Sequence, residues 1–248
     1  MMESAAKPIP MIVNEYTVAE VERRVGDGAL LFSKHPLLKR LEGSGVVAEA
    51  HAMAKAVTFF VFCFQDMLRL VRERISDPQI KAEARVHELE DNGHEKWFLD
   101  DLHHFGIVPD ISWLFGPAHQ GARDVSYELV AEILRAPDDW SRLSIVLVLE
   151  AAAAECFGRA IGFMERLGEA GGLKYFAGLH QRAEQAHEMF DPKKRAHVFS
   201  GALSRESFQN CCATVDKAFS AMSTFADYVE DSMRDVPQCA TTSGGDDR

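Results

Sequence analysis

The chain has 248 residues, with 27 Lys and Arg against 38 Asp and Glu, which gives a formal net charge of −11 at pH 7. This length fits one domain with a sizeable core, and a hydrophobic share of 47% is that of an ordinary globular protein. Nucleic acid is not an expected partner, because phosphate binding needs clustered Lys and Arg. The five cysteines form no CxxC pair and are odd in number, which favours a reducing, cytoplasmic location.

No secretory signal is evident, since the N-terminus lacks a basic and then apolar block. The two most apolar stretches, 56–64 and 145–164, are too short or carry charged side chains. We therefore expect no membrane span.

Helix is predicted almost throughout, because the sequence has no alternating pattern of β-branched residues with tight turns. Residues 1–16 are predicted to be a flexible arm, 17–235 a single helical domain, and 236–248 a disordered tail. The predicted helices cover 17–25, a short segment from His35 onward, 46–75, 78–105, 123–135, 139–167, 173–189 and 204–234.

Capping residues and glycines set the predicted helix ends. Ser76 or Asp77 caps the helix that has Pro78 in its first turn. Gly106 ends that helix, and the run Gly26-Asp27-Gly28 follows the first helix. Asp138 and Asp139 precede the long apolar helix and can cap it.

The strongest chemical pattern is His180-x3-Glu184-x2-His187. Residues at these spacings project to one side of a helix, so the three side chains can converge. Two imidazoles and a carboxylate suit ferrous iron, and Glu-x-x-His is the helix motif of di-iron bundles. A broad solvated helix face with no ligand role is the alternative.

Glu150 is an isolated carboxylate in an apolar run, Ile145 to Ala154. A buried carboxylate needs a cation, a hydrogen-bond partner or a raised pKa, and a bridging position between metal ions would satisfy it. The alternative is that Glu150 faces solvent or pairs with an Arg. Glu155 lies five positions on, about 140° round the helix, and is expected to point elsewhere.

His87 and His94 are seven apart and share a face of the predicted 78–105 helix, which makes both candidate ligands. His35, His51, His103 and His104 have no partner at ligand spacing. The first long helix has no carboxylate from Ala52 to Phe64, although a di-iron bundle needs one near its middle. Cys156 has no activating neighbour and is expected to be a packing residue.

Taken together, these residues resemble the heme-oxygenase-like dimetal oxidases and oxygenases, relatives of the TenA and PqqC families. The resemblance covers about residues 30–234 and rests on His94, Glu150 and the 180–187 motif in order. It implies a heme-oxygenase-like bundle in which His94, Glu150 and His187 hold one metal, His180 and Glu184 hold the other, and Glu150 bridges. His87 stands where the family usually has a glutamate, so one metal position is expected to be weak, filled only transiently, or lost.

The resemblance implies one or two Fe²⁺ per chain and O₂ as co-substrate. The expected activity is oxidation of a small amino-acid-derived or amine substrate, by N-oxygenation or oxidative C–C cleavage, in natural-product biosynthesis. Arg159 and Lys174 are candidates for binding a substrate carboxylate, and a homodimer is expected because the superfamily commonly associates. Two alternatives stay open: a metal-free helical binding or cofactor-independent protein on the same scaffold, and a ferritin-like iron protein.

Overall fold

The computed structural model describes residues 16–185 and 201–236, and this part of the chain is an all-α bundle, as the sequence predicts. The predicted arm and tail fall outside it except for residues 16 and 236. The helices are α1 (Val18–Phe32), α2 (Pro36–Glu42), α3 (Val47–Arg74), α4 (Pro78–Glu90), α5 (His94–His104), α6 (Ile111–Leu114), α7 (Gln120–Arg135), α8 (Asp139–Arg166), α9 (Gly178–Gln185) and α11 (Arg205–Arg234).

Two minor elements complete the description. A 3₁₀ turn, η1 (Pro117–His119), leads into α7. The two-residue strands β1 (Tyr16–Thr17) and β2 (Ala202–Leu203) pair antiparallel. The sequence gives no sign of this pair, because two residues are too few to show an alternating pattern.

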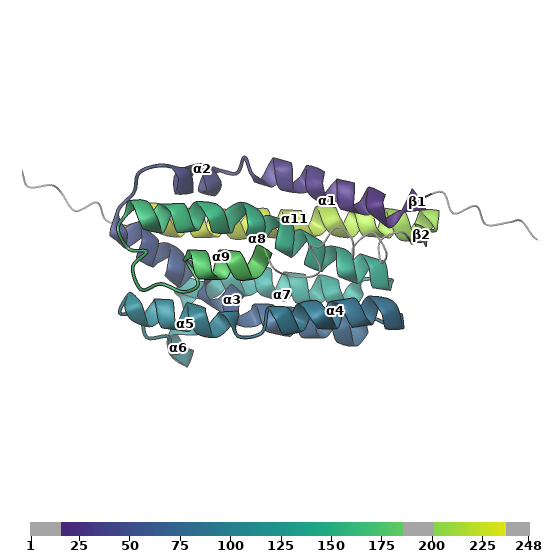
Figure 1. The fold of residues 1–248 in the computed structure, drawn as a ribbon, viewed down its shortest axis with the longest axis horizontal. Coiled ribbons are helices and arrows are strands. Elements are labelled where there is room, and N and C mark those ends of the chain that lie inside the picture. The colour runs from purple at the N-terminus through teal and green to yellow at the C-terminus, as the bar shows by residue number, and fades with distance from the viewer. Residues whose placement is uncertain (1–15, 186–200, 237–248) are drawn as a thin grey trace, which may run out of the picture.

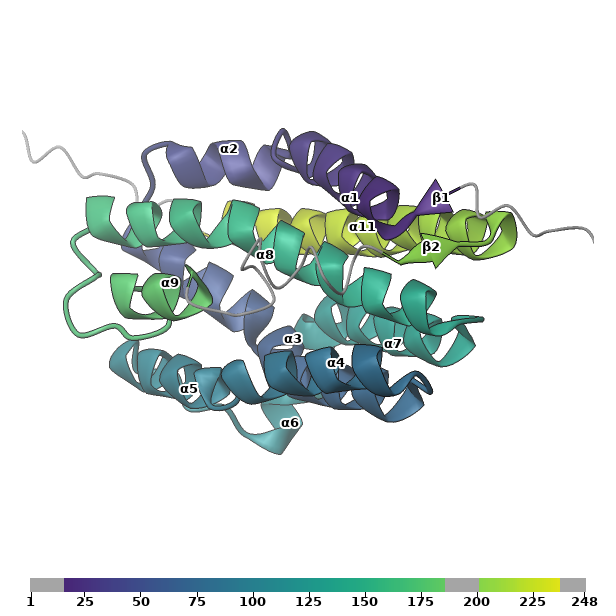
Figure 2. The same ribbon diagram turned by 45° about the vertical axis from the view of Figure 1, so that its right-hand side comes forward.

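The long helices α8 and α11 run side by side through the bundle and pack against each other. The helices α1 and α2 lie along one side, and α4 and α5 lie along the opposite side (Figure 1 and Figure 2). The helix α3 packs against α7, α11, α4 and α8. The α8–α11 pair therefore stands between two outer layers.

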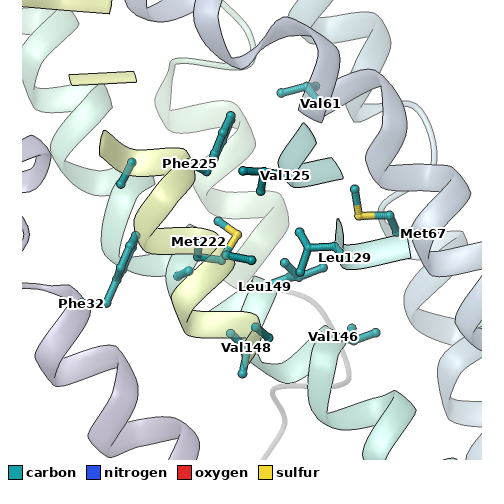
Figure 3. Close-up of a cluster of buried hydrophobic side chains, with 14 of the residues drawn as sticks. Phe32, Val61, Met67, Val125, Leu129, Val146, Val148, Leu149, Met222 and Phe225 are labelled. Carbon is teal, nitrogen blue, oxygen red and sulfur yellow. The ribbon is translucent and has the colours of Figure 1, made fainter. Parts of the chain in front are cut away.

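Apolar faces explain this packing. The α8 segment from Ile145 to Leu149 is buried at every position, as expected for a helix that is covered on all sides. Buried side chains of α7, α8 and α11 meet in one cluster, which includes Leu129, Leu149 and Phe225 (Figure 3). Burial of this surface is the main stabilising contribution to the fold.

Polar side chains begin several helices where the sequence predicts. The Asp77 carboxylate accepts hydrogen bonds from the backbone N–H groups of Gln79 and Ile80, at 2.8 and 3.1 Å. Asp138 accepts from the N–H of Ser141 at 2.8 Å. These bonds satisfy donors that a helix leaves unpaired in its first turn.

Among the described residues, α3 is the one helix whose length and composition would allow it to cross a membrane. The central helix of a bundle meets the same criterion, and α3 packs against α4, α5, α7, α8 and α11 of this bundle.

Three predicted helix boundaries are wrong. The first helix continues to Phe32 instead of ending near residue 25, because Gly26 and Gly28 are accommodated inside it. The predicted 78–105 helix breaks into α4 and α5, since Gly93 adopts a left-handed φ of 105°. The helix predicted to start at 173 starts at Gly178, because Asp101 takes up the N–H groups of residues 174–176.

Candidate functional site

A cavity of about 140 Å³ lies inside the bundle. Residues from α1, α2, α3, α8 and α11 line it, together with the start of α5 and the segment 175–180. Most of the lining is apolar. The exceptions include three candidate ligands, His94, Glu150 and His180, which come from three separate elements and reach the same cavity.

Glu150 is buried, with 4% of its surface exposed, so it does not face solvent. Its Oε1 lies 2.8 Å from Nε2 of His87, which is also buried. A carboxylate oxygen accepts, so Nε2 of His87 carries the proton. The expectation that Glu150 needs a hydrogen-bond partner is confirmed, and the alternative of pairing with an Arg is wrong. Glu155 does point elsewhere and pairs with Arg159 at 2.7 Å.

His94 stands at the first position of α5, directly after the helix break. Its Nδ1 lies 2.9 Å from Oδ1 of Asp91, and Oδ2 of Asp91 accepts from Nε2 of Gln65 at 2.6 Å. Because the carboxylate accepts, Nδ1 of His94 carries the proton and the lone pair of the neutral ring is on Nε2. This is the orientation by which protein carboxylates prepare an imidazole to bind a metal.

His180 is held in the same tautomer by a backbone group. Its Nδ1 lies 3.1 Å from the carbonyl oxygen of Tyr175, which can only accept. The His180 ring stacks on Tyr175 with centroids 4.2 Å apart and meets the His94 ring edge-on at 4.6 Å. The two imidazoles thus lie next to each other, each with a bonded Nδ1–H.

Asp101 fixes the segment that positions His180. This buried carboxylate accepts three backbone hydrogen bonds, from Lys174 at 2.7 Å, Tyr175 at 3.0 Å and Phe176 at 2.8 Å. Burial raises the pKa of Asp101, and the three N–H donors oppose that rise. Asp101 is not among the site residues that the sequence predicts. Its position could have indicated that it is buried, because Asp101 follows Phe98 by three positions on the apolar stripe of α5.

Gln65 occupies the α3 wall of the cavity, one position beyond the span that has no carboxylate. It donates to Asp91 and so belongs to the hydrogen-bonded group that orients His94. The absence of a carboxylate from Ala52 to Phe64 stands: the side chains of this span that line the cavity are apolar, and the polar side chain that α3 adds next to them is a neutral amide.

The other sequence predictions have different outcomes. His87 and His94 do not share a helix, because the chain breaks between them. His87 contacts Glu150, and His94 lines the cavity. The Glu184 side chain and all of His187 lie outside the described residues, so convergence of the 180–187 motif stays a prediction. Within 16–185 and 201–236, no three His, Cys, Asp or Glu side chains form a group that could hold a metal ion.

The residues present match the donor types of an iron site. Two oriented imidazoles and a buried carboxylate face one cavity, and these are ligands that ferrous iron takes in proteins. Such a site would need further ligands beyond His94, Glu150 and His180. Glu184 and His187 are the candidates, because they continue the chain from His180.

The two basic candidates for binding a substrate carboxylate do not line the cavity. Arg159 pairs with Glu42 at 2.7 Å and with Glu155. The Lys174 ammonium pairs with Asp100, and both side chains are about half exposed. Arg159 and Lys174 are close to the candidate ligands in sequence, but their side chains do not reach the cavity. Each side chain points outward to an acidic neighbour.

Cys156 lines the cavity as a free thiol, and burial raises its pKa to about 12. At neutral pH it is therefore protonated, which fits packing and not nucleophilic chemistry. His35, which has no partner at ligand spacing in the sequence, does not line the cavity. Its Nδ1 accepts the N–H of Leu37 at the start of α2, and its Nε2 lies 3.1 Å from Asp227.

No protein-family model matches the chain, and no curated protein matches it. The class of this protein therefore follows from its structure alone. It is an all-α bundle with an internal, mostly apolar cavity that is lined by oriented histidines and a buried glutamate.

Proposed function

We propose that this protein is a non-heme iron oxidase or oxygenase that activates O₂ to oxidise a small organic substrate, and that it belongs with the heme-oxygenase-like dimetal enzymes. One observation carries the proposal: His94 and His180 line the same cavity as Glu150, and each imidazole has its Nδ1–H bonded. In this tautomer Nε2 is the ring atom whose lone pair can bind a metal.

The chain's own residues have distinct tasks in this proposal. His94, Glu150 and His180, with Glu184 and His187, would hold one or two Fe²⁺, which supply the reaction with O₂. Asp91 and the Tyr175 carbonyl hold the two imidazoles in one tautomer. His87 holds Glu150 through one oxygen. The apolar walls exclude water from the reacting groups.

A metal-free binding protein on the same scaffold is the second candidate function. The His87–Glu150 hydrogen bond favours it, because this bond gives the buried carboxylate a partner without any cation. In this case His180 would have a structural role, and its replacement would leave ligand binding intact.

Metal analysis distinguishes the two functions. The full chain is loaded with Fe²⁺ without oxygen, separated from unbound metal and analysed for iron, beside the double variant His180→Ala/His187→Ala. We expect about one or two irons per chain in the wild type and loss of iron in the variant. His103→Ala is the matched control, because His103 is exposed at the end of α5. Absence of stoichiometric iron in the wild type would refute the oxidase proposal.

A further inference from the structure

The cavity has two chemically different walls. Its side toward α1 and α2 is apolar, with Phe32, Leu37 and Leu41. Its side toward the start of α5 carries Asp91, His94 and Glu95. These elements lie on opposite sides of the bundle (Figure 1 and Figure 2). A ligand that fills the cavity therefore meets hydrocarbon at one end and carboxylates and imidazoles at the other.

The size of the cavity limits the ligand. Its volume of about 140 Å³ is close to that of an engineered apolar cavity of about 150 Å³ that binds benzene. One ring, or a chain of about six to eight non-hydrogen atoms, fills such a space. Aromatic side chains, among them Phe60, Phe157 and Phe225, surround it and favour a ring or a short alkyl group.

The charge of the lining selects the polar end of the ligand. Three carboxylates, Asp91, Glu95 and Glu150, line the cavity, and no Lys or Arg does so among the described residues. With neutral imidazoles these carboxylates sum to −3, and one bound divalent cation would leave −1. An anionic ligand would be buried with no cationic side chain of the described residues in the lining beside it, which is strongly unfavourable.

Glu150 provides a specific acceptor for a cationic or hydrogen-bond-donating group. His87 bonds Oε1, and no described residue bonds the second oxygen, Oε2. The residue is 4% exposed, so a ligand in the cavity can supply the missing donor where water has little access. Hydrogen bonds to a charged acceptor in such a site are stronger than those between neutral groups.

We propose that the cavity binds a small apolar amine, with a body of about the size of benzene against the apolar wall and its nitrogen toward the carboxylates. If the amine is the substrate of the oxidase, the inference rests on the proposed function. Binding of the amine by itself requires neither iron nor O₂. The amine site and the oxidase function can therefore fail separately.

Calorimetric titration of the full chain tests the inference with three probes of one shape: benzylamine, benzyl alcohol and benzoate. The protein is first treated with a chelator, and the titrations are repeated with one equivalent of Zn²⁺, which has no redox chemistry. We expect benzylamine to bind about tenfold or more tightly than benzoate to the chelator-treated protein, and Zn²⁺ to reduce this preference, because Glu150 would then hold the metal. Equal or tighter binding of benzoate, or no binding of benzylamine, by the chelator-treated protein would overturn the proposal.

Paired variants of α8 locate the binding. Ala153 lines the cavity and its neighbour Ala154 is exposed. We expect Ala153→Phe to abolish binding of all three probes and Ala154→Phe to leave it unchanged. Glu150→Gln should reduce the preference for benzylamine over benzoate about tenfold. A folded Ala153→Phe variant that binds the probes as the wild type does would refute the site. If that variant does not fold, the preference of Glu150→Gln for benzylamine over benzoate decides. A preference equal to that of the wild type would overturn the proposal.

Discussion

At the scale of single residues, each buried carboxylate has its own partner. Glu150 bonds a histidine, Asp91 bonds a histidine and an amide, and Asp101 bonds three consecutive backbone N–H groups. Buried polar groups are tolerated only when they are satisfied in this way. These three bonded groups position every described candidate ligand of the cavity.

Asp101→Asn tests the positioning role of this carboxylate. An amide presents one N–H₂ group toward backbone donors, so at least one of the three bonds is lost and a buried donor is left unpaired. We expect the free energy of unfolding to fall by about 1–3 kcal/mol, measured by urea denaturation. Chelator-treated Asp101→Asn should also bind Zn²⁺ about tenfold more weakly, because the Tyr175 carbonyl no longer holds His180.

The neighbouring Asp100→Asn is the control. Asp100 pairs with the Lys174 ammonium at the surface, and exposed ion pairs contribute little to stability. Equal losses of stability and Zn²⁺ affinity in both variants would contradict the positioning role of Asp101.

At the scale of elements, the contact between α1 and α11 depends on a glycine. A Cβ added to Gly28 would stand 2.3 Å from Cε2 of Phe219 on α11, whereas one added to Gly26 would have no atom within 4 Å. The two helices can approach closely at Gly28 because it has no side chain.

A matched pair of variants measures this contact. Gly28→Ala forces the Phe219 ring or the helix to move, and we expect it to lower the free energy of unfolding by about 1–3 kcal/mol. Gly26→Ala should raise it by about 0.5–1 kcal/mol, since alanine is the better residue inside an exposed helix. Denaturant melts of both variants decide, and two changes of the same sign would refute the close contact.

The break between α4 and α5 decides which groups His87 and His94 contact. Heptad spacing of His87 and His94 suggests one helix face, but Gly93 ends the regular geometry. The chain then restarts with His94 in the first turn of α5, within reach of Asp91. His87 is left to bond Glu150. One interruption thus gives the two histidines different tasks.

At the scale of the whole molecule, one buried histidine links stability to pH. His119 in η1 is 2% exposed and contacts Trp113. Burial lowers its pKa from the ordinary value of 6.5, and Arg123 lowers it further. The unfolded chain therefore binds a proton at His119 before the folded chain does, so stability is lost as pH falls below 6.5.

His119→Gln removes this proton uptake. We expect the wild type to lose up to about 1.4 kcal/mol of unfolding free energy per pH unit through His119 below that value. The variant should show a flatter slope over the same interval, whatever its stability at neutral pH. Urea denaturation at several pH values provides the comparison. Parallel pH profiles for the two proteins would contradict a lowered pKa of His119.

The sequence by itself determined the helical class, most helix starts and the need of Glu150 for a buried partner. These properties are local: apolar periodicity, capping and the cost of an isolated carboxylate all act within a few turns. Within the described residues it also indicated His94 and His180, which the structure brings to one cavity.

Only the tertiary structure decided which groups these residues meet. His87 bonds a carboxylate 63 positions away, and Asp101 bonds backbone groups 73–75 positions away. The tertiary structure also places Arg159 and Lys174 outside the lining of the cavity. Such contacts arise when helices pack across long stretches of chain, and no periodicity within one helix specifies the partner on another.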